Sequence, residues 1–600
     1  MNIKNKEKKN TPSIIEIENL SAQYKNKNFL FAEKLAIDMT KKFPNFLFGW
    51  KALGITLIKI GKFNEAIIIY KKIIGRLPND HDAYFNLANC LREQGDLTNA
   101  EDYYKRAISV NPKYSLALNN LGLTLQMQNK LREAIDYYNK SIELDPKNYM
   151  AINNLGHASL EQGDLNKAET CFKKAILLNP KYALAFYNLG LTFLKKEKLD
   201  NAEKYFCKAL DLRQNLPEAW LNLGNLLDEK NQLHEAENYF KKAISFKKNY
   251  TDALIGLASV LHQQGKLDES EKIYKNLIST DNKNENVNFN LSLIYNLKGN
   301  FKDGFKLYES RFHLKEHSTI QPRKKFIWDG STSIKGKKFL IYEEQGLGDI
   351  IQFCRYLPLL EQKGGNVIFK VKSKMHHLLN TLNCKIHLTD KFNSEDYIDF
   401  ESPLMSLPNL FNTKLNSIPS KLSYLKADPK KIIEWKKRLK SNDLKIGICW
   451  QGSKKKIDKG RSFSLEFFRE ISKIPNIQLI SLYKGEDEKK LFEINFKITS
   501  FGNNFDNEKD AFIDTAAIMM SCDLIITCDT AIAHLAGALG RPVWVALKYI
   551  PDWRWMLKRS DTPWYPSMRL YRQTKINDWN NVFNQIKINL KNLKKDSFNV

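Results

Sequence analysis

Two short segments of this 600-residue chain combine residue types that could do chemistry. The first, 346–349, reads Gly-Leu-Gly-Asp, follows an apolar run and opens a helical pattern that continues to residue 360. The glycines Gly346 and Gly348 allow a tight turn, and a helix start presents free N–H groups to an anion or a hydroxyl. Asp349 follows the second glycine, where it could belong to such a binding site or simply cap its helix, so both roles stay open.

The second segment, 528–542, begins at the end of an apolar run and opens another helix. Asp529, Thr530 and His534 lie at its start, where the helix dipole and free N–H groups could hold a diphosphate. A single histidine on the first turns of a helix is more commonly a core residue. The segment therefore indicates either a phosphate site or an ordinary packed helix.

A bound diphosphate would need positive charge, which helix N–H groups and a lysine or arginine can supply without a metal ion. Lys484 is the first candidate, followed by Lys459 or Arg461 in the 452–462 loop, although each could be an ordinary surface charge. The one Asp-x-Asp sequence, 80–82, lies far away in the N-terminal half, and the eight cysteines show no paired metal-ligand spacing. We therefore expect no metal ion and no cofactor.

Both segments belong to the second half of the chain, where short apolar runs alternate with amphipathic helical stretches. Buried strands are expected at 339–342, 367–369, 446–450, 477–482, 524–527 and 543–547. Helices between most of these strands predict parallel sheets with crossover connections. The stretch 418–445, which contains Pro419 and Pro429, should divide two sheets, so we expect two Rossmann-like lobes that face a cleft.

The first half carries a different pattern, which recurs every 34 residues from 13 to 318. A Leu-Gly or similar pair recurs from Leu53-Gly54 onward, with a second small residue and then an aromatic residue at constant spacing behind it. Small residues let two helices approach closely, and the leucines and aromatic rings fill the remaining space. With Trp50 before the pair and Pro78 at its end, the unit matches the tetratricopeptide repeat. We predict a solenoid of about nine such helical hairpins.

An asparagine stands just before the small-residue pair in six of the repeats: Asn86, Asn120, Asn154, Asn188, Asn222 and Asn290. This resembles the asparagine ladder of the nucleocytoplasmic O-linked sugar transferases, whose side chains line the concave face and hold an extended peptide. A carboxamide has both donors and an acceptor, so it can pair with peptide groups of any sequence. The alternative is that these asparagines bond within the solenoid, and the sequence does not separate the two.

The two chemical segments together are similar to the heptosyltransferase-related enzymes of glycosyltransferase family 9, a GT-B group, and to bacterial proteins that fuse such a module to tetratricopeptide repeats. The resemblance covers about 337–575 and includes the segments 402–408, 481–485 and 551–555. It implies a metal-independent transfer from a nucleotide-sugar donor held mainly by the second lobe. It also implies that Asp349 is the general base and that the start of the 528–542 segment contacts the donor phosphates.

The sequence departs from that family in two places. The first lobe is short for a free-standing heptosyltransferase, so the repeats could supply part of the acceptor side. Position 531 is alanine where these enzymes often carry glycine, so the backbone would approach a phosphate less closely.

The formal net charge of +27 comes mostly from lysines spread along the chain among acidic residues, asparagines and isoleucines. This distribution disfavours a nucleic-acid partner and is compatible with an anionic ligand such as a sugar nucleotide. No apolar run reaches the length of a transmembrane helix, and residues 1–10 are not followed by the apolar stretch of a signal peptide. A cytoplasmic protein without an integral membrane segment is therefore expected.

The expected organisation is an all-α solenoid followed by a two-lobed α/β module of the GT-B type. Its parts are a polar tail (1–12), the solenoid (13–318), a linker (319–336), an acceptor-side lobe (337–425) and a nucleotide-sugar lobe with a C-terminal helix (441–600). The leading hypothesis is a glycosyltransferase whose array recruits a protein or glycan acceptor. The rival hypothesis is a non-catalytic scaffold with a degenerate transferase-like domain. A third is envelope-sugar assembly, with a lipid-linked or polysaccharide acceptor and an array that docks a membrane complex.

Overall fold

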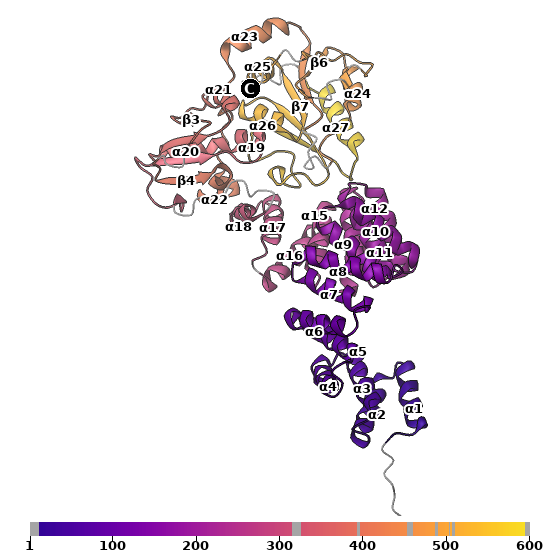
Figure 1. Cartoon of the computed structure of the whole chain (residues 1–600). Helices are drawn as coiled ribbons and strands as arrows, with labels where there is room; N and C mark the ends of the chain where they lie inside the picture. Colours follow the sequence, from indigo (N-terminus) through magenta and orange to yellow (C-terminus); the bar gives the residue numbers. More distant parts are fainter. Residues whose placement is uncertain are drawn as a thin grey trace, which may run out of the picture. The chain divides into compact units, whose positions relative to one another are not determined.

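The computed structural model describes residues 11–281, 283–314, 326–392, 397–452, 460–485, 490–491, 493–502, 505–506 and 510–593 (Figure 1). The chain divides into two compact units, Met1–Leu226 and Leu227–Val600. The boundary lies inside the helical repeats, so the last repeats belong to the same unit as the α/β lobes.

The first unit is a series of helical hairpins. Its helices are α1 (Ile14–Lys25), α2 (Phe29–Lys42), α3 (Leu47–Ile60), α4 (Phe63–Arg76), α5 (His81–Glu93), α6 (Leu97–Val110), α7 (Ser115–Met127), α8 (Leu131–Leu144), α9 (Tyr149–Glu161), α10 (Leu165–Leu178), α11 (Ala183–Lys195) and α12 (Leu199–Leu212), while α13 (Pro217–Glu229) extends across the unit boundary. The predicted solenoid of tetratricopeptide hairpins is confirmed.

The small residues of the repeat pattern lie where the two helices of a hairpin meet. A Cβ atom added to Gly122 in α7 would lie 2.7 Å from Cε1 of Tyr138 in α8, far inside contact distance. Gly54 stands in the same relation to Tyr70, at 2.8 Å from Cζ. Both rings are buried because the absent methyl group leaves room for them.

A residue with left-handed backbone follows the first helix of most hairpins. Glycine holds this position at Gly61, Gly95, Gly163, Gly265 and Gly299, with φ between 82° and 85°. Asn129 and Asn231 hold it elsewhere, with φ of 63° and 60°. Asparagine tolerates this conformation better than most residues, so the turn geometry is kept where glycine is absent.

The second unit begins with the end of the solenoid. Its repeat helices are α14 (Leu233–Phe246), α15 (Thr251–Gln263), α16 (Leu267–Thr280), α17 (Glu285–Leu297), α18 (Phe301–Tyr308) and the 3-10 helix η1 (Glu309–His313). The helices of the α/β part are α19 (Leu347–Phe353), α20 (Leu357–Gln362), α21 (His376–Leu379), α22 (Leu407–Leu410), α23 (Pro429–Arg438), α24 (Arg469–Ser472), α25 (Ile513–Ser521), α26 (Ala531–Ala538), α27 (Trp579–Lys591) and the 3-10 helix η11 (Trp553–Trp555).

Two parallel sheets form the α/β part. The first has the order β3-β2-β1-β4 and contains β1 (Lys338–Tyr342), β2 (Asn366–Lys370), β3 (His387–Thr389) and β4 (Phe400–Pro403). The second has the order β6-β5-β7-β8-β9 and contains β5 (Leu444–Cys449), β6 (Ile477–Ser481), β7 (Leu524–Cys528), β8 (Val543–Leu547) and β9 (Met568–Arg572). The expected pair of Rossmann-like lobes is confirmed as a fold class.

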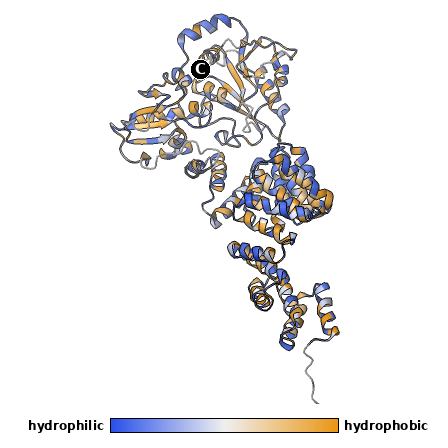
Figure 2. Cartoon of the chain, in the orientation of Figure 1, coloured by the Kyte–Doolittle hydropathy of each residue, from blue (hydrophilic) through white to orange (hydrophobic). Residues whose placement is uncertain are grey.

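Three short strands, β3, β4 and β9, were not expected from the sequence. β4 carries the buried Glu401 and ends in Pro403, and β9, at the edge of its sheet, is interrupted by the exposed Arg569. Neither forms the continuous apolar run by which the central strands are recognised. Figure 2 shows those central strands coloured as hydrophobic, whereas α23 is largely hydrophilic. No helix among the described residues is long and apolar enough to cross a membrane.

Candidate functional site

Asp349 lies at the start of α19, directly after the turn that leaves β1. Its Oδ2 atom accepts a hydrogen bond of 2.9 Å from the backbone N–H of Gly346, so the aspartate caps its own helix. The turn before it is tight because Gln345 has a left-handed φ of 62°. The capping alternative raised by the sequence is therefore present, and it occupies one of the two carboxylate oxygens.

The other oxygen of Asp349 meets an arginine from the second lobe. Arg554, in η11, donates from Nη2 to Oδ1 of Asp349 at 2.5 Å. It also donates from Nη1 to Asp552 at 2.8 Å and from Nε to Oε1 of Gln352 at 2.7 Å. Arg554 is 7% exposed, so this guanidinium is a buried cation that joins the two lobes. The segment 551–555 contributed to the family resemblance, but no spacing in the sequence singled out its arginine.

The pKa values of the three aspartates around Arg554 are shifted in different directions. Burial raises the pKa of Asp349, and Arg554 acts against that rise. Burial also opposes ionisation of Asp552, but the adjacent guanidinium prevails and its pKa is lowered. The pKa of Asp529 is raised to about 6 by burial and by the charge of Asp552, while Arg461, the indole of Trp555 and Arg554 act in the opposite direction. The pKa values of Asp349 and Asp529 are therefore raised, whereas that of Asp552 is lowered.

His534 lies on the first turns of α26 and is packed on every side. Its Nδ1 atom is 2.9 Å from the hydroxyl of Tyr565, and its ring stacks on Trp555 with the centroids 5.3 Å apart. Burial lowers the pKa of the imidazole to about 3, so His534 is neutral at pH 7. It can exchange hydrogen bonds with a ligand but cannot supply positive charge to one.

The starts of α19 and α26 approach each other closely. A Cβ atom added to Gly348 would lie 3.0 Å from Cδ2 of His534 and 3.4 Å from the Cα of Ala531. Any larger residue at 348 would push the two lobes apart at this point. The structure therefore brings Asp349, Gly348 and His534, which the sequence separates by almost two hundred residues, into one place.

The remaining candidate residues differ in their surroundings. Arg461 is half-buried and close enough to Asp529 to influence its charge, and Thr530 is the residue before the first turn of α26. Lys484 donates from Nζ to the backbone carbonyl of Phe505 at 2.6 Å and to that of Asp506, so its ammonium group holds the chain at 505–506. Lys459 lies outside the described residues.

The asparagines of the repeats form a hydrogen-bonded chain within the solenoid. Asn154 donates to Oδ1 of Asn119 at 3.0 Å, and Asn188 donates to Oδ1 of Asn153 at 3.1 Å. Asn120 donates to Asn89, and Asn222 donates to the hydroxyl of Tyr187. Asn86 and Asn290 occupy the same repeat position and are half-buried. The sequence identified one member of each linked pair but not its neighbours at 89, 119 and 153.

This chain of amides has consequences for a ligand. Each carboxamide has two donor hydrogens and two acceptor positions, so the bonds within the chain use only part of its capacity. A hydrogen bond to the NH2 group or to the oxygen of a carboxamide also orients the rest of that group. This lowers the conformational entropy that the side chain loses when a peptide binds. Asn188 is buried, whereas Asn120, Asn154 and Asn222 are half-buried, so bonding within the solenoid leaves part of those three amides accessible to a peptide.

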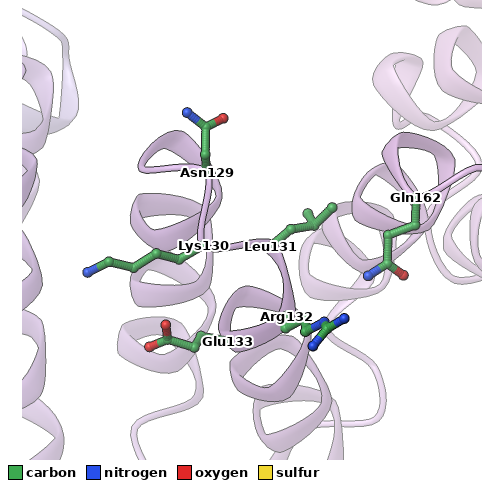
Figure 3. A pocket seen from close by; sticks show the side chains of 6 residues that line it. All are labelled: Asn129, Lys130, Leu131, Arg132, Glu133 and Gln162. Atoms are coloured by element: carbon green, nitrogen blue, oxygen red, sulfur yellow. The ribbon is translucent and has the colours of Figure 1, made fainter.

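A hollow on the first unit lies at the turn between α7 and α8. It has a volume of about 410 Å³ and is lined by Asn129, Lys130, Leu131, Arg132, Glu133 and Gln162. Figure 3 shows Leu131 and Arg132 extending toward Gln162, while Lys130 and Glu133 point away from it. Lys130 is already paired with Glu101 at 2.9 Å, so the lining offers no convergent set of polar groups.

Comparison with known proteins gives a family match in the first half of the chain. Residues 47–293 match the family described as the Cilia and flagella-associated protein 70 C-terminal domain. The N-terminal half is a tetratricopeptide array. Protein FlbA of Caulobacter vibrioides is 27% identical over 280 residues, which are 42% of this chain and 46% of FlbA. The chain therefore spans less than half the length of that relative.

Three solved structures are also similar to part of this chain. The Cut9–Hcn1 hetero-tetramer of the APC/C has 21% identity and a TM-score of 0.37, over 40% of this chain and 48% of that one. Pseudomonas aeruginosa pilF has 23% identity and a TM-score of 0.33, over 36% of this chain and 96% of that one. YrrB, a TPR protein with an unusual peptide-binding site, has 22% identity and a TM-score of 0.25, over 31% and 95%.

Proposed function

We propose that the protein is a metal-independent glycosyltransferase of the GT-B type, related to glycosyltransferase family 9, that moves a sugar from a nucleotide-sugar donor to an acceptor recruited by its repeats. The observation that carries this proposal is the contact between Asp349 of one lobe and Arg554 of the other, beside the start of α26. A carboxylate, a buried cation and free helix N–H groups at one place are what sugar transfer needs.

In the proposed reaction, Asp349 takes the proton of an acceptor hydroxyl. The hydroxyl oxygen forms a bond to the anomeric carbon as the bond from that carbon to the diphosphate oxygen breaks. The electron pair of the broken bond leaves with the nucleoside diphosphate. We assign Arg554 and the N–H groups at the start of α26 to that negative charge, because helix starts and arginines stabilise phosphates by the same electrostatics.

The ion pair suggests how the donor prepares the base. Arg554 lowers the proton affinity of Asp349 and so opposes the effect of burial. A diphosphate that takes over the guanidinium would remove this influence and leave a buried carboxylate, which is a stronger base. Donor binding would therefore activate Asp349 without any large movement.

We assign donor binding to the second lobe, with Asp529, Thr530, His534 and Arg461 around the diphosphate and Lys484 as a support of that lobe. The neutral His534 would contribute a hydrogen bond, and Arg461 a second positive charge. We assign acceptor binding to the amide chain of the array. That chain would hold a protein segment by its backbone, whereas a glycan acceptor would use the same donors and acceptors for its hydroxyls.

One observation favours the non-catalytic scaffold as the second candidate. Both oxygens of Asp349 already have partners, Gly346 and Arg554, which is also what a purely structural aspartate would have. The two functions differ in what an added nucleotide sugar does to this pair.

The test is a panel of nucleotide sugars, measured for binding by calorimetry and for slow hydrolysis in the absence of acceptor. We expect one donor to bind, and we expect Asp349→Asn still to bind it while losing hydrolysis and transfer. Asp561→Asn is the matched control, because Asp561 is exposed and its ion pair is with Arg559, outside the candidate site. If no nucleotide sugar binds the wild-type chain, the transferase proposal fails and the scaffold is supported.

A further inference from the structure

The loop 549–556 carries Asp552, Arg554 and Trp555, and it lies against the last two repeats. A Cβ atom added to Gly265, in the turn between α15 and α16, would lie 3.1 Å from Cδ1 of Ile550. One added to Gly299, in the turn between α17 and α18, would lie 2.6 Å from Cε of Met556. Two successive repeats therefore contact the two ends of the same loop through the same turn position.

The centre of the loop is fixed by aromatic rings. Trp553 packs edge-on against Phe305 and Tyr308 of α18, with centroid distances of 5.5 and 6.2 Å. Phe301 lies 6.3 Å away in the same arrangement. All four rings are buried, and Arg554 follows Trp553 directly in the chain. The position of Arg554 is thus set by a residue whose packing partners belong to the last repeat.

The turn that carries Asp349 is held by the same repeat. Arg311 of η1 is 1% exposed and binds Glu344 through two bonds of 2.9 and 2.8 Å. The same guanidinium donates to the hydroxyl of Ser406 at 2.8 Å. The next residue along that turn, Gln345, donates from Nε2 to the hydroxyl of Tyr308 at 3.0 Å. Both lobes therefore contact the last repeat, one through the turn before Asp349 and the other through Trp553, the residue before Arg554.

Backbone strain accompanies this packing at Met556, whose φ of 52° is rare for a side chain of its kind. Such conformations persist where the surroundings over-determine them. Gly299 and the rings of α18 are part of those surroundings. The equivalent glycines of earlier repeats, Gly61, Gly95 and Gly163, have the same backbone but nothing within 4 Å of an added Cβ.

We propose that the last two repeats are a positioning frame for the site, in which Gly299, Tyr308 and Arg311 hold Arg554 and Asp349 at bonding distance. The kinetic part of this inference rests on the proposed transferase function. The structural part does not, because it concerns the order of the loop 549–556. The end of the array then belongs to the same structural module as the proposed catalytic site.

The test compares Gly299→Asn with Gly95→Asn in the full chain. Asparagine already holds this turn position at Asn129 and Asn231, so the backbone change is small and equal in both variants. We expect hydrogen exchange of the amides in 549–556 to accelerate at least about tenfold in Gly299→Asn and to stay at the wild-type rate in Gly95→Asn. Met556→Ala should restore slow exchange in the Gly299 variant, because it removes the group that the new side chain displaces.

A second comparison uses Tyr308→Phe and Tyr274→Phe, which occupy the same position in successive repeats and remove only a hydroxyl. We expect Tyr308→Phe to lower kcat about tenfold with an unchanged donor Kd, and Tyr274→Phe to leave both unchanged. Equal exchange rates in the two glycine variants, or equal kcat in the two tyrosine variants, would overturn the positioning role. If the wild-type chain transfers no sugar, the exchange comparison alone decides the inference, and only the proposed function is lost.

Discussion

The ion pair between the lobes makes a sharp prediction for the variant Arg554→Gln. The guanidinium is 7% exposed and has Asp349 and Asp552 as its charged partners. Removing one partner of a buried pair leaves an uncompensated charge and typically costs about 3–5 kcal/mol. Two carboxylates lose their partner here, but both can be protonated, so we expect a loss of about 3–5 kcal/mol at pH 8.

The loss should depend on pH in a definite direction. Without the arginine, burial and mutual repulsion raise the pKa of both acids above the ordinary value of about 3.9 in the unfolded chain. A raised folded-state pKa makes the charged form costly, so the penalty is present above that pKa and disappears as the acids take up protons. The difference between the variant and the wild type should therefore shrink steadily as the pH falls from 8 to about 4.

The assay is urea unfolding of the full chain followed by tryptophan fluorescence. Eight of the ten tryptophans lie at residue 328 or beyond, so the signal reports mainly the α/β part. Arg559→Gln is the control, because its partner Asp561 is exposed and such pairs contribute less than about 1 kcal/mol. A loss for Arg554→Gln that is equal at pH 4.5 and pH 8, or no larger than that of the control, would refute the reasoning.

Three further predictions concern the array. Gly122→Ala should destabilise the first unit by about 1–3 kcal/mol, because its methyl group meets a buried ring. Gly75→Ala, with open space around it, should stabilise α4 by about 0.5–1 kcal/mol. Thermal melting of the two variants should therefore show shifts of opposite sign. Burial opposes ionisation of Glu101, but its two bound lysines prevail and lower its pKa to about 2. Glu101 should therefore contribute stability above about pH 4.5 that is lost as the pH falls toward 2. Glu101→Gln should flatten this pH dependence of stability in acid titrations followed by circular dichroism, and an unchanged slope would contradict the prediction. Asn188→Ala should cost about 1–3 kcal/mol because the buried Oδ1 of Asn153 loses its donor, and urea unfolding with no loss would show that water replaces the amide.

The repeats could be predicted in detail because their information is local. The helices of each hairpin are neighbours in the chain, so the pairing of Gly122 with Tyr138 is visible as a constant spacing. The central strands were predictable for a similar reason, since burial on both faces demands a continuous apolar run. β4 and β9 were missed because Glu401 and Arg569 interrupt that run.

The site was only partly predictable. Asp349, Asp529 and His534 could be named because each follows a strand at a helix start, a place that the order of residues reveals. Arg554 could not, because its importance comes from a partner 205 residues away. The structure also gives Lys484 a role in binding carbonyls at 505–506, which no spacing indicated.

The amino-acid sequence by itself determined the solenoid and the pair of parallel α/β lobes. The periodic small and apolar residues that specify a repeat helix or a central strand lie within one or two helical turns or within one strand. Only the tertiary structure decided which charges meet. Asp349 and Arg554 come from different lobes, and Glu344 and Arg311 come from the turn after β1 and from the last repeat. Such ion pairs form where elements that are distant in the chain pack against each other. An unpaired charge in such a buried place would cost so much free energy that an opposite charge must lie beside it. The asparagine chain lies between these cases: the repeat set its spacing, and the packing of neighbouring hairpins decided that Asn154 bonds to Asn119.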